Sequence, residues 1–199
     1  MVGEYRNICE SWDQEFERNR QLHGDRIQCR SGCSACCSQL FQITEPEAAV
    51  ISQGVQTLDA NTAEALKEKA LRYLGARAEL LARGVGDEAW GSLPPPGSRL
   101  ACPALSEAGE CKIYPYRPLI CRRFGVPLWN PDRPGRVYAC ELNFREGEAI
   151  EDNRLIQIQT DLHQQWKRFQ RDYNVRGGYR DAKPLTIARA ILEDFAALL

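Results

Sequence analysis

The sequence predicts a mostly α-helical protein whose helices surround an irregular, cysteine-rich centre, with little or no sheet. Three observations predict this fold class. Apolar residues recur at helical spacing in several segments, no segment alternates apolar and polar residues convincingly, and eight of the nine cysteines lie in two blocks, 29–37 and 102–140. A chain of 199 residues can bury its own core, so we expect a single domain over residues 1–199.

The first element is an amphipathic helix over residues 5–22. Its apolar face carries Tyr5, Ile8, Trp12 and Phe16. Charged residues occupy the other face, as in a helix that packs on a core. Cys9 lies near the apolar stripe, so we expect a small buried core residue there rather than a metal ligand.

A helical hairpin is predicted over residues 45–83, inserted between the two cysteine blocks. Thr44 can cap the first helix with Glu47 as its capping-box partner, and Pro46 suits the first turn. Gly54 is expected to end this helix.

The second helix of the hairpin is predicted over residues 62–83. Asn61 and Glu64 can form its cap, and Gly84 is expected to stop it. The apolar positions that recur at helical spacing are Leu66, Ala70, Leu74 and Leu81.

Irregular structure is expected between the hairpin and the C-terminal helices. Residues 84–100 contain LPPPG and predict a loop, and residues 101–147 predict short turns with one short helix over 118–124. Two helices, over 148–173 and 185–198, are predicted to form a C-terminal segment over 148–199, with a break at Gly177 and Gly178.

The composition excludes several classes of partner. A net charge of −1 gives no electrostatic footprint for nucleic acid, and the apolar stretches are too short and too charged to span a membrane. The N-terminal residues lack the layout of a signal peptide, so we expect a cytoplasmic protein. We find no glycine-rich nucleotide loop, P-loop or nucleophile elbow, so the sequence does not decide whether the protein is an enzyme.

The cysteines point to metal binding. In a cytosolic chain of this size, a dense cysteine cluster indicates metal binding or catalysis more often than disulfides, and the adjacent pair Cys36 and Cys37 makes full pairing awkward. In many metal sites a compact knuckle supplies several ligands on tight turns, and distant segments of the chain complete the coordination shell of the metal. Soft thiolates suit zinc, copper(I) and iron–sulfur clusters.

Cys29-x3-Cys33-x2-Cys36 has the spacing found in enzymes that perform radical chemistry on S-adenosylmethionine, but the rest of the chain argues against this class. In those enzymes the motif follows the first strand of a parallel barrel, whereas here a predicted helix precedes it and no strand alternation follows. The further cysteines would also stay unexplained.

Several other side chains are candidates for roles around the thiols. Arg117 and Arg122 near Cys121, and Arg30 beside Cys29, can compensate the charge of grouped thiolates. His23 lies near the first block and is weighed as an alternative ligand, although we expect it to be a bystander. Trp12 and Trp166 are expected to be core or boundary residues, and His163 a surface or boundary residue. Trp90 and Trp129 are candidates to cover the metal site.

Two motifs resemble the YkgJ-type cysteine cluster proteins, a family of zinc- or iron-chelating domains. CRSGCSACCSQLFQITEPEAAVI resembles the first motif of the family, and CPALSEAGECKIYPYRPLICRRFG resembles the second. The resemblance covers roughly residues 29–51 and 102–140, and we expect residues 29–51 and 101–140 to form the metal-binding centre. Related domains occur in flagellin lysine-N-methylases, where an iron–sulfur cluster is implied.

The resemblance implies a set of site residues. The candidate metal ligands are Cys29, Cys33, Cys36, Cys37, Cys102, Cys111, Cys121 and Cys140. The motif positions around them are Tyr114, Arg117, Pro118 and Arg122.

The cofactor and the function stay open between alternatives. Structural zinc usually shows two C-x2-C pairs and this chain has one, so an iron–sulfur cluster, 4Fe-4S in type, is favoured over zinc. The favoured function is redox chemistry or metal handling through the thiolates. The alternatives are a zinc-binding structural or partner-docking module, which would use the C-terminal helices for an unidentified protein partner, and a component of a methyl-transfer or oxidoreductase system.

Overall fold

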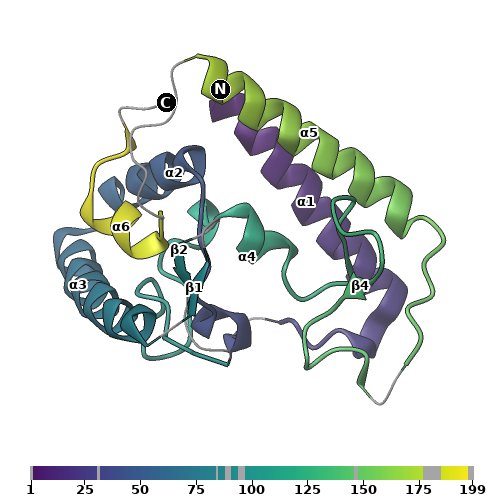
Figure 1. The fold of residues 1–199 in the computed structure, drawn as a ribbon, viewed down its shortest axis with the longest axis horizontal. Coiled ribbons are helices and arrows are strands. Elements are labelled where there is room, and N and C mark those ends of the chain that lie inside the picture. Colours follow the sequence, from purple (N-terminus) through teal and green to yellow (C-terminus); the bar gives the residue numbers. More distant parts are fainter. Residues whose placement is uncertain are drawn as a thin grey trace. The chain divides into compact units, whose positions relative to one another are not determined.

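The computed structural model describes residues 2–30, 32–83, 85–87, 91–93, 97–145, 148–176 and 185–196, with the backbone alone at 2, 85–87 and 91–93. The predicted fold class is confirmed: within these residues helices dominate, and the strands form only two short antiparallel pairs (Figure 1). The α-helices are α1 (Val2–His23), α2 (Glu45–Gln56), α3 (Ala60–Ala82), α4 (Leu119–Arg123), α5 (Leu155–Val175) and α6 (Ile187–Leu192). The 3-10 turns are η1 (Gly24–Arg26), η2 (Ala35–Ser38) and η3 (Tyr114–Tyr116).

The chain divides into two compact units. The first unit consists of Met1–Cys36 and Leu119–Arg180, and the second consists of Cys37–Pro118 and Asp181–Leu199. The chain passes from the first unit to the second between the adjacent residues Cys36 and Cys37. The single domain over 1–199 stays a prediction.

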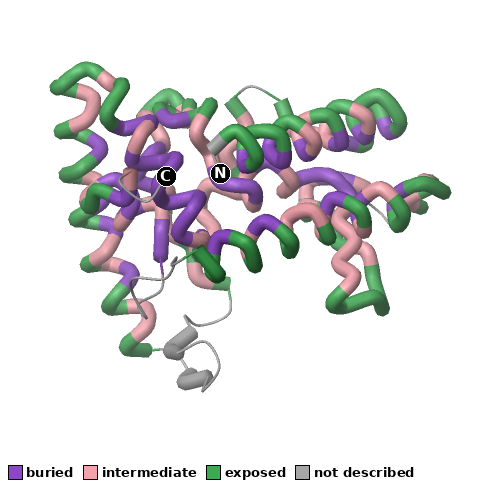
Figure 2. The backbone as a smooth tube through the Cα atoms, turned by 90° about the horizontal axis from the view of Figure 1, so that it is seen from above, coloured by how far each residue is buried: buried purple, intermediate pink, exposed green. Residues whose placement is uncertain are grey.

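Helices α1 and α5 lie side by side in the first unit (Figure 1). Tyr5 of α1 is buried against Trp166 and Phe169 of α5, with ring centroids 6.2 Å and 5.9 Å away. Aromatic rings supply large apolar areas, so this contact holds the two helices together. The predicted apolar face of the first helix is confirmed, and Trp12 on the same face is also buried. Figure 2 shows how buried and exposed residues alternate along the helices.

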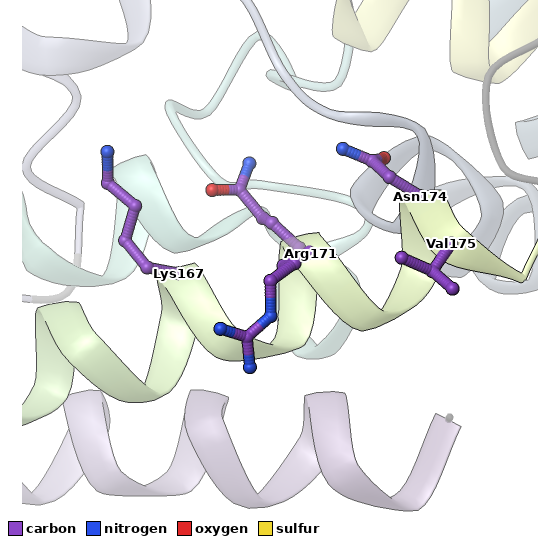
Figure 3. Close-up of a pocket in the computed structure, with 5 residues that line it drawn as sticks. Lys167, Arg171, Asn174 and Val175 are labelled. Atoms are coloured by element: carbon purple, nitrogen blue, oxygen red, sulfur yellow. The ribbon is translucent and has the colours of Figure 1, made fainter.

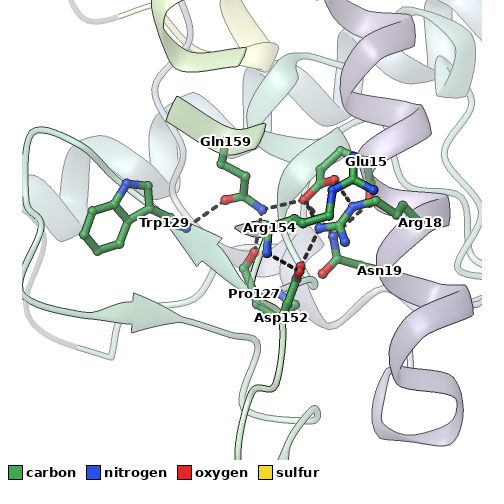
Figure 4. Close-up of polar contacts among 8 residues, drawn as sticks. All are labelled: Glu15, Arg18, Asn19, Pro127, Trp129, Asp152, Arg154 and Gln159. Carbon is green, nitrogen blue, oxygen red and sulfur yellow. Dashed lines mark hydrogen bonds and ion pairs between the residues drawn. The ribbon is translucent and has the colours of Figure 1, made fainter. Parts of the chain in front are cut away.

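A buried polar network joins α1 to the segment before α5 (Figure 4). The carboxylate of Glu15 accepts hydrogen bonds from Arg18 Nε at 2.6 Å and from Asn19 Nδ2 at 2.8 Å. The Arg18 guanidinium also donates to Asp152 Oδ2 at 2.5 Å. Both carboxylates are therefore buried with partners, which offsets the cost of removing their charge from water.

Gln159 of α5 extends this network to the first strand of a short ladder (Figure 4). Its amide nitrogen donates to Glu15 Oε1 at 3.0 Å and to the Pro127 carbonyl at 2.9 Å, and its oxygen accepts from the Trp129 N–H at 2.8 Å. The ladder pairs β3 (Leu128–Trp129) with β4 (Val137–Tyr138). Gln159 is fully buried, so the position of the segment 127–129 depends on it.

Helix α5 begins seven residues later than the predicted start at 148, at Leu155. The side chain of Asp152 explains the difference, because its Oδ1 accepts from the Arg154 N–H at 3.0 Å while its Oδ2 binds Arg18. An aspartate that binds the backbone two residues ahead favours a turn over a helix.

The second unit has one apolar cluster between α2, α3 and α6. Its fully buried members are Ala48, Ala49, Ile51, Ala70, Ala188 and Ala190. Several of these are alanines, so the helix backbones can approach closely. An extended bridge in which the Ile43 N–H donates to the Leu185 carbonyl at 3.0 Å leads into both α2 and α6.

The predicted start of α2 is confirmed, but its predicted end is wrong. The Thr44 N–H donates to Glu47 Oε2 at 2.7 Å, as a capping box requires. The helix passes through Gly54 and ends at Gln56. A Cβ on Gly54 would overlap with the Tyr116 ring, so the glycine permits close packing of η3 rather than a helix stop.

The predicted cap of α3 is also wrong. Asp59, not Asn61, is the N-cap residue: its Oδ1 accepts from the Thr62 N–H at 2.9 Å. Both residues are good cap types, and the extended backbone at Asp59 decides between them. The helix ends at Ala82, close to the predicted end.

The last helix, predicted over 185–198, is shorter: α6 spans Ile187–Leu192, with Thr186 as its N-cap. Ser52 of α2 explains the early end. Its hydroxyl donates to the carbonyls of Ala190 and Glu193, and its oxygen accepts from the Phe195 N–H at 3.2 Å. A buried serine thus takes over the backbone groups that a further helical turn would have paired.

The segment predicted as a loop over 84–100 contains a short antiparallel pair of strands, β1 (Val85–Asp87) and β2 (Gly91–Leu93). The short helix predicted at 118–124 is confirmed as α4.

The predictions for Gly84, Trp90, Gly177 and Gly178 lie outside the described residues. Within the described residues, none of the helices has the length and apolar character needed to cross a bilayer.

Candidate metal centre

The structure distributes the eight candidate cysteines over the two units. The first unit contains Cys29, Cys33, Cys36, Cys121 and Cys140, and the second contains Cys37, Cys102 and Cys111. All eight are half-buried, and no disulfide joins any of the nine cysteines, all of which the structure describes. Cys9 is buried on α1 at 5% exposure, which confirms its predicted place in the core.

The first cysteine block forms a turn-rich knuckle after η1. The Cys33 N–H donates to the Arg30 carbonyl at 3.0 Å, and Gly32 between them adopts a left-handed φ of 83°. Cys36 and Cys37 lie in the single turn η2. Tight turns of this kind bring thiols close together along the chain, as zinc and iron–sulfur sites require.

The Cys29 sulfur lies against the backbone of Gly125. A Cβ on Gly125 would overlap with this sulfur, and Gly125 has a φ of 109°, which side chains rarely adopt. Only glycine therefore fits at this position. The backbone after α4 covers the sulfur on one side, which limits its contact with water.

Asn143 holds Cys29 and Gly125 together. Its amide nitrogen donates to Cys29 Sγ at 3.9 Å and, in a very short contact, to the Gly125 carbonyl. Its oxygen accepts from the Gln28 N–H at 2.8 Å. Asn143 is buried, and it ties the knuckle to the segment that follows Cys140.

Cys29 has three other thiols close enough to affect its charge. Burial raises the pKa of the Cys29 thiol to about 11, although the hydrogen bond from Asn143 acts in the opposite direction. The cysteines whose charges raise this pKa further are Cys33, Cys140 and Cys36. The surroundings of Cys29 therefore penalise negative charge on its sulfur, which a bound metal cation would relieve.

In the second unit, three thiols lie on short turns. The Cys102 N–H donates to the Cys37 carbonyl at 2.7 Å, so the two residues are joined through their backbones. Cys111 pairs with Leu105 in an isolated bridge, and the Lys112 N–H donates to the Ala104 carbonyl at 2.9 Å. Residues 102–112 thus form a small hairpin, called the cysteine hairpin here, with a cysteine near each end.

Two predicted compensating arginines have other partners. The buried Arg122 places Nη1 2.5 Å from Asp13 Oδ2, an ion pair that ties α4 to α1 within the first unit. The Arg117 guanidinium lies 3.9 Å from the ring centroid of Tyr114, which is exposed. Arg30 is also exposed. The roles predicted for these residues beside the thiols stay predictions.

The two histidines lie in different settings. His23 is buried and packs edge-on against Phe144, with ring centroids 5.0 Å apart. His163 is half-buried, with Nε2 3.3 Å from Asp132 Oδ2, as expected for a boundary residue. Trp129 is half-buried in β3.

The donor set fits a soft metal by its chemistry, since thiol sulfur is the ligand that zinc and iron–sulfur clusters prefer. In the described part of the chain, no three His, Cys, Asp or Glu side chains already converge tightly enough to hold an ion.

Two hollows contain no thiol. One, of about 510 Å³, lies on α5 and is lined by Lys167, Gln170, Arg171, Asn174 and Val175 (Figure 3). The other, of about 700 Å³, is lined by residues of α1 and of 151–154. Neither hollow belongs to the cysteine centre.

The sequence pattern missed Gly125 and Asn143. Asn143 follows Cys140 at a C-x2-N spacing, which is the one local hint. Nothing in the sequence signals that Gly125 lies against Cys29, because that contact forms only when two distant segments fold together.

A helical chain that presents thiols on tight turns, with a buried amide beside one sulfur, has the features of a cysteine-cluster metal-binding protein. The family model "CxxCxxCC: Putative zinc- or iron-chelating domain" matches residues 28–137, more than half of the chain. The chain belongs to this family, with three residues rather than two between its first two cysteines. Comparisons with curated proteins and with solved structures gave no match.

Proposed function

We propose that this metal-binding protein is an iron–sulfur protein, with a role in redox chemistry or metal handling. The observation that carries the proposal is the setting of the Cys29 sulfur, which lies against the Gly125 backbone beside the Asn143 amide, with three further thiols near enough to affect its charge. A 4Fe-4S cluster takes four thiolates, and the electrostatic environment of Cys29 includes Cys33, Cys36 and Cys140. When bound, such a cluster supplies one-electron transfer.

The side chains around Cys29 suit this role. Asn143 donates an N–H toward the sulfur, and hydrogen bonds to cluster sulfurs are among the features that set reduction potential. The Gly125 backbone covers the same sulfur, which excludes water from that side. Both features favour a thiolate whose charge is shared with a metal.

The test begins with anaerobic purification, followed by iron, acid-labile sulfide and zinc analysis of the full chain. We expect iron and sulfide in stoichiometric amounts. Cys29→Ser and Cys140→Ser should lose them, and Cys9→Ala, which changes a core residue, should retain them. Stoichiometric zinc with neither iron nor sulfide in the wild type would contradict the proposal.

A zinc site is the second candidate, and the second unit favours it. Cys37, Cys102 and Cys111 lie on short turns, and a backbone hydrogen bond joins Cys102 to Cys37. Thiols on tight turns are typical of structural zinc, which would take a fourth ligand beside these three. In that case Cys102→Ser would release zinc and lower the melting temperature, because the binding free energy of structural zinc contributes to folding. The two candidates are compatible within one chain.

A further inference from the structure

One face of α3 carries three polar side chains toward the cysteine hairpin. Lys69, Tyr73 and Arg77 are four residues apart, so they lie along one side of the helix. Lys69 Nζ donates to the Leu105 carbonyl at 2.9 Å, which fixes this side of α3 against the hairpin between Cys102 and Cys111.

The same face is buried. Tyr73 is 8% exposed and Arg77 is 6% exposed, and Tyr73 belongs to the apolar cluster against which Cys102 and Cys111 pack. Arg77 is thus a cation that the second unit has removed from water. Burying a charge costs free energy unless an opposite charge or hydrogen bonds compensate it.

The compensation of Arg77 is incomplete among the described residues. Its guanidinium interacts with the Tyr73 hydroxyl, but Nη1 is buried without a hydrogen-bond partner. An orphaned N–H on a buried cation points to an anion as its partner.

Thiolates are the anions that this region can supply. Cys102 and Cys111 pack against the apolar cluster that contains Tyr73, and Arg77 follows Tyr73 by one helical turn on the same face of α3. Cys37 is joined to Cys102 through the backbone. A divalent ion held by three or four thiolates carries a net negative charge, which needs a neighbouring cation.

We propose that Arg77 is the buried counter-charge of the thiolate group Cys37, Cys102 and Cys111, and positions this group for metal binding. The inference rests on the proposed function, because it requires that these thiols bind a metal. The inference is separate from the roles predicted for Arg117 and Arg122 beside Cys121, because Cys121 lies outside this group.

Two substitutions separate charge from packing. Arg77→Met keeps a long apolar stem without the charge, and Arg77→Lys keeps the charge. Arg72→Met is the matched control, because Arg72 lies on the exposed side of the same helix beside Glu68.

The measurement is a competitive titration of the metal-depleted full chain with zinc and, separately, with cobalt, whose thiolate absorption reports sulfur ligation. We expect Arg77→Met to weaken binding by about 10- to 100-fold, the usual effect of losing an outer-shell partner. Arg77→Lys should lie near the wild type, and Arg72→Met should match it.

Stability provides a readout that a packing role alone would not produce. Without metal, Arg77→Met should melt at the same temperature as the wild type or higher, because a buried charge with an orphaned N–H is removed. With metal, the same variant should melt lower. Adding Arg77→Met to Cys102→Ser should weaken zinc binding no further, because the two changes act on one group.

Two results would overturn the inference while leaving the proposed function intact. One is wild-type zinc affinity in Arg77→Met. The other is an equal loss of melting temperature with and without metal, which would make Arg77 a packing residue. A wild-type chain that binds neither zinc, cobalt nor iron would instead remove the proposed function itself, and the inference with it.

Discussion

The backbone of Gly125 lies so close to the Cys29 sulfur that a single added carbon would overlap with it. The two residues come from different segments of the first unit, and Asn143 donates hydrogen bonds to both. The site around Cys29 therefore depends on one glycine and one amide as much as on its thiols.

Replacing Gly125 with alanine should displace the Cys29 thiol. The added Cβ meets the sulfur, and the left-handed backbone adds strain. We expect metal affinity to fall by at least about tenfold, as when an outer-shell support is lost, measured by competition with a chelator. Gly135→Ala is the control, because a Cβ there meets nothing within 4 Å. Unchanged affinity in both variants would show that Cys29 is not a ligand.

Replacing Asn143 with aspartate should weaken metal binding without removing a thiol. The variant keeps an oxygen for the Gln28 N–H but loses the N–H groups that face Cys29 and Gly125. We expect a loss of about 10- to 100-fold in affinity and, for an iron–sulfur cluster, a lower reduction potential. The potential is measured by redox titration. Asn130→Asp, whose side-chain oxygen accepts from the Asp132 N–H, should leave both quantities unchanged.

The free energy of unfolding should depend on pH because His23 is buried. Burial lowers its pKa below 6.5; Asp152 opposes this shift, whereas Arg26 and Arg18 add to it. The unfolded chain therefore binds more protons, so the stabilisation is full above pH 6.5 and decreases as the pH falls through the folded pKa.

His163 acts with the same sign, since burial also lowers its pKa; Asp132 opposes this, while Lys167 and Arg123 contribute to it. Urea unfolding between about pH 7.5 and 5.5 should give a slope of at most about 1.4 kcal/mol per pH unit for each histidine. His23→Gln should flatten the curve, and His163→Gln should flatten it further. Parallel curves for wild type and His23→Gln would contradict this assignment.

Two glycines inside helices should respond to alanine in opposite directions. At Gly75 of α3 a Cβ meets nothing within 4 Å, so Gly75→Ala should stabilise by about 0.5–1 kcal/mol. At Gly54 of α2 the Cβ overlaps with the Tyr116 ring, and overpacking should outweigh the propensity gain and destabilise by about 1–3 kcal/mol. Thermal unfolding of both variants checks the pair. A stabilised Gly54→Ala would mean that η3 does not pack on α2.

Local patterns predicted the elements whose causes are local. The capping box at Thr44 and Glu47 needs residues three apart, and it formed as predicted. The start of α5 could not be predicted in the same way, because the turn at Asp152 is stabilised by Arg18, 134 residues away in the chain. The early end of α6 likewise depends on Ser52 of another helix.

The same distinction applies to the site. The cysteines are visible in the sequence because their spacing is local, but Asn143 reaches Cys29 across 114 residues. Arg77 was detectable in principle: it follows Leu66, Ala70 and Tyr73 on a helical stripe that is otherwise buried. A charge on an apolar face is the pattern that would have identified it.

Gln159, which holds β3 in place, also provides the hydrogen-bond partners for the backbone at the free edge of that strand. Gln159 accepts from the Trp129 N–H and donates to the Pro127 carbonyl, the two groups that a third strand would pair with. One side chain thus pairs both backbone groups inside the first unit, where water has little access to them. Gln159→Leu should therefore leave an N–H and a carbonyl without partners in the interior, and the consequence would be a fold less stable by about 1–3 kcal/mol for each orphaned group.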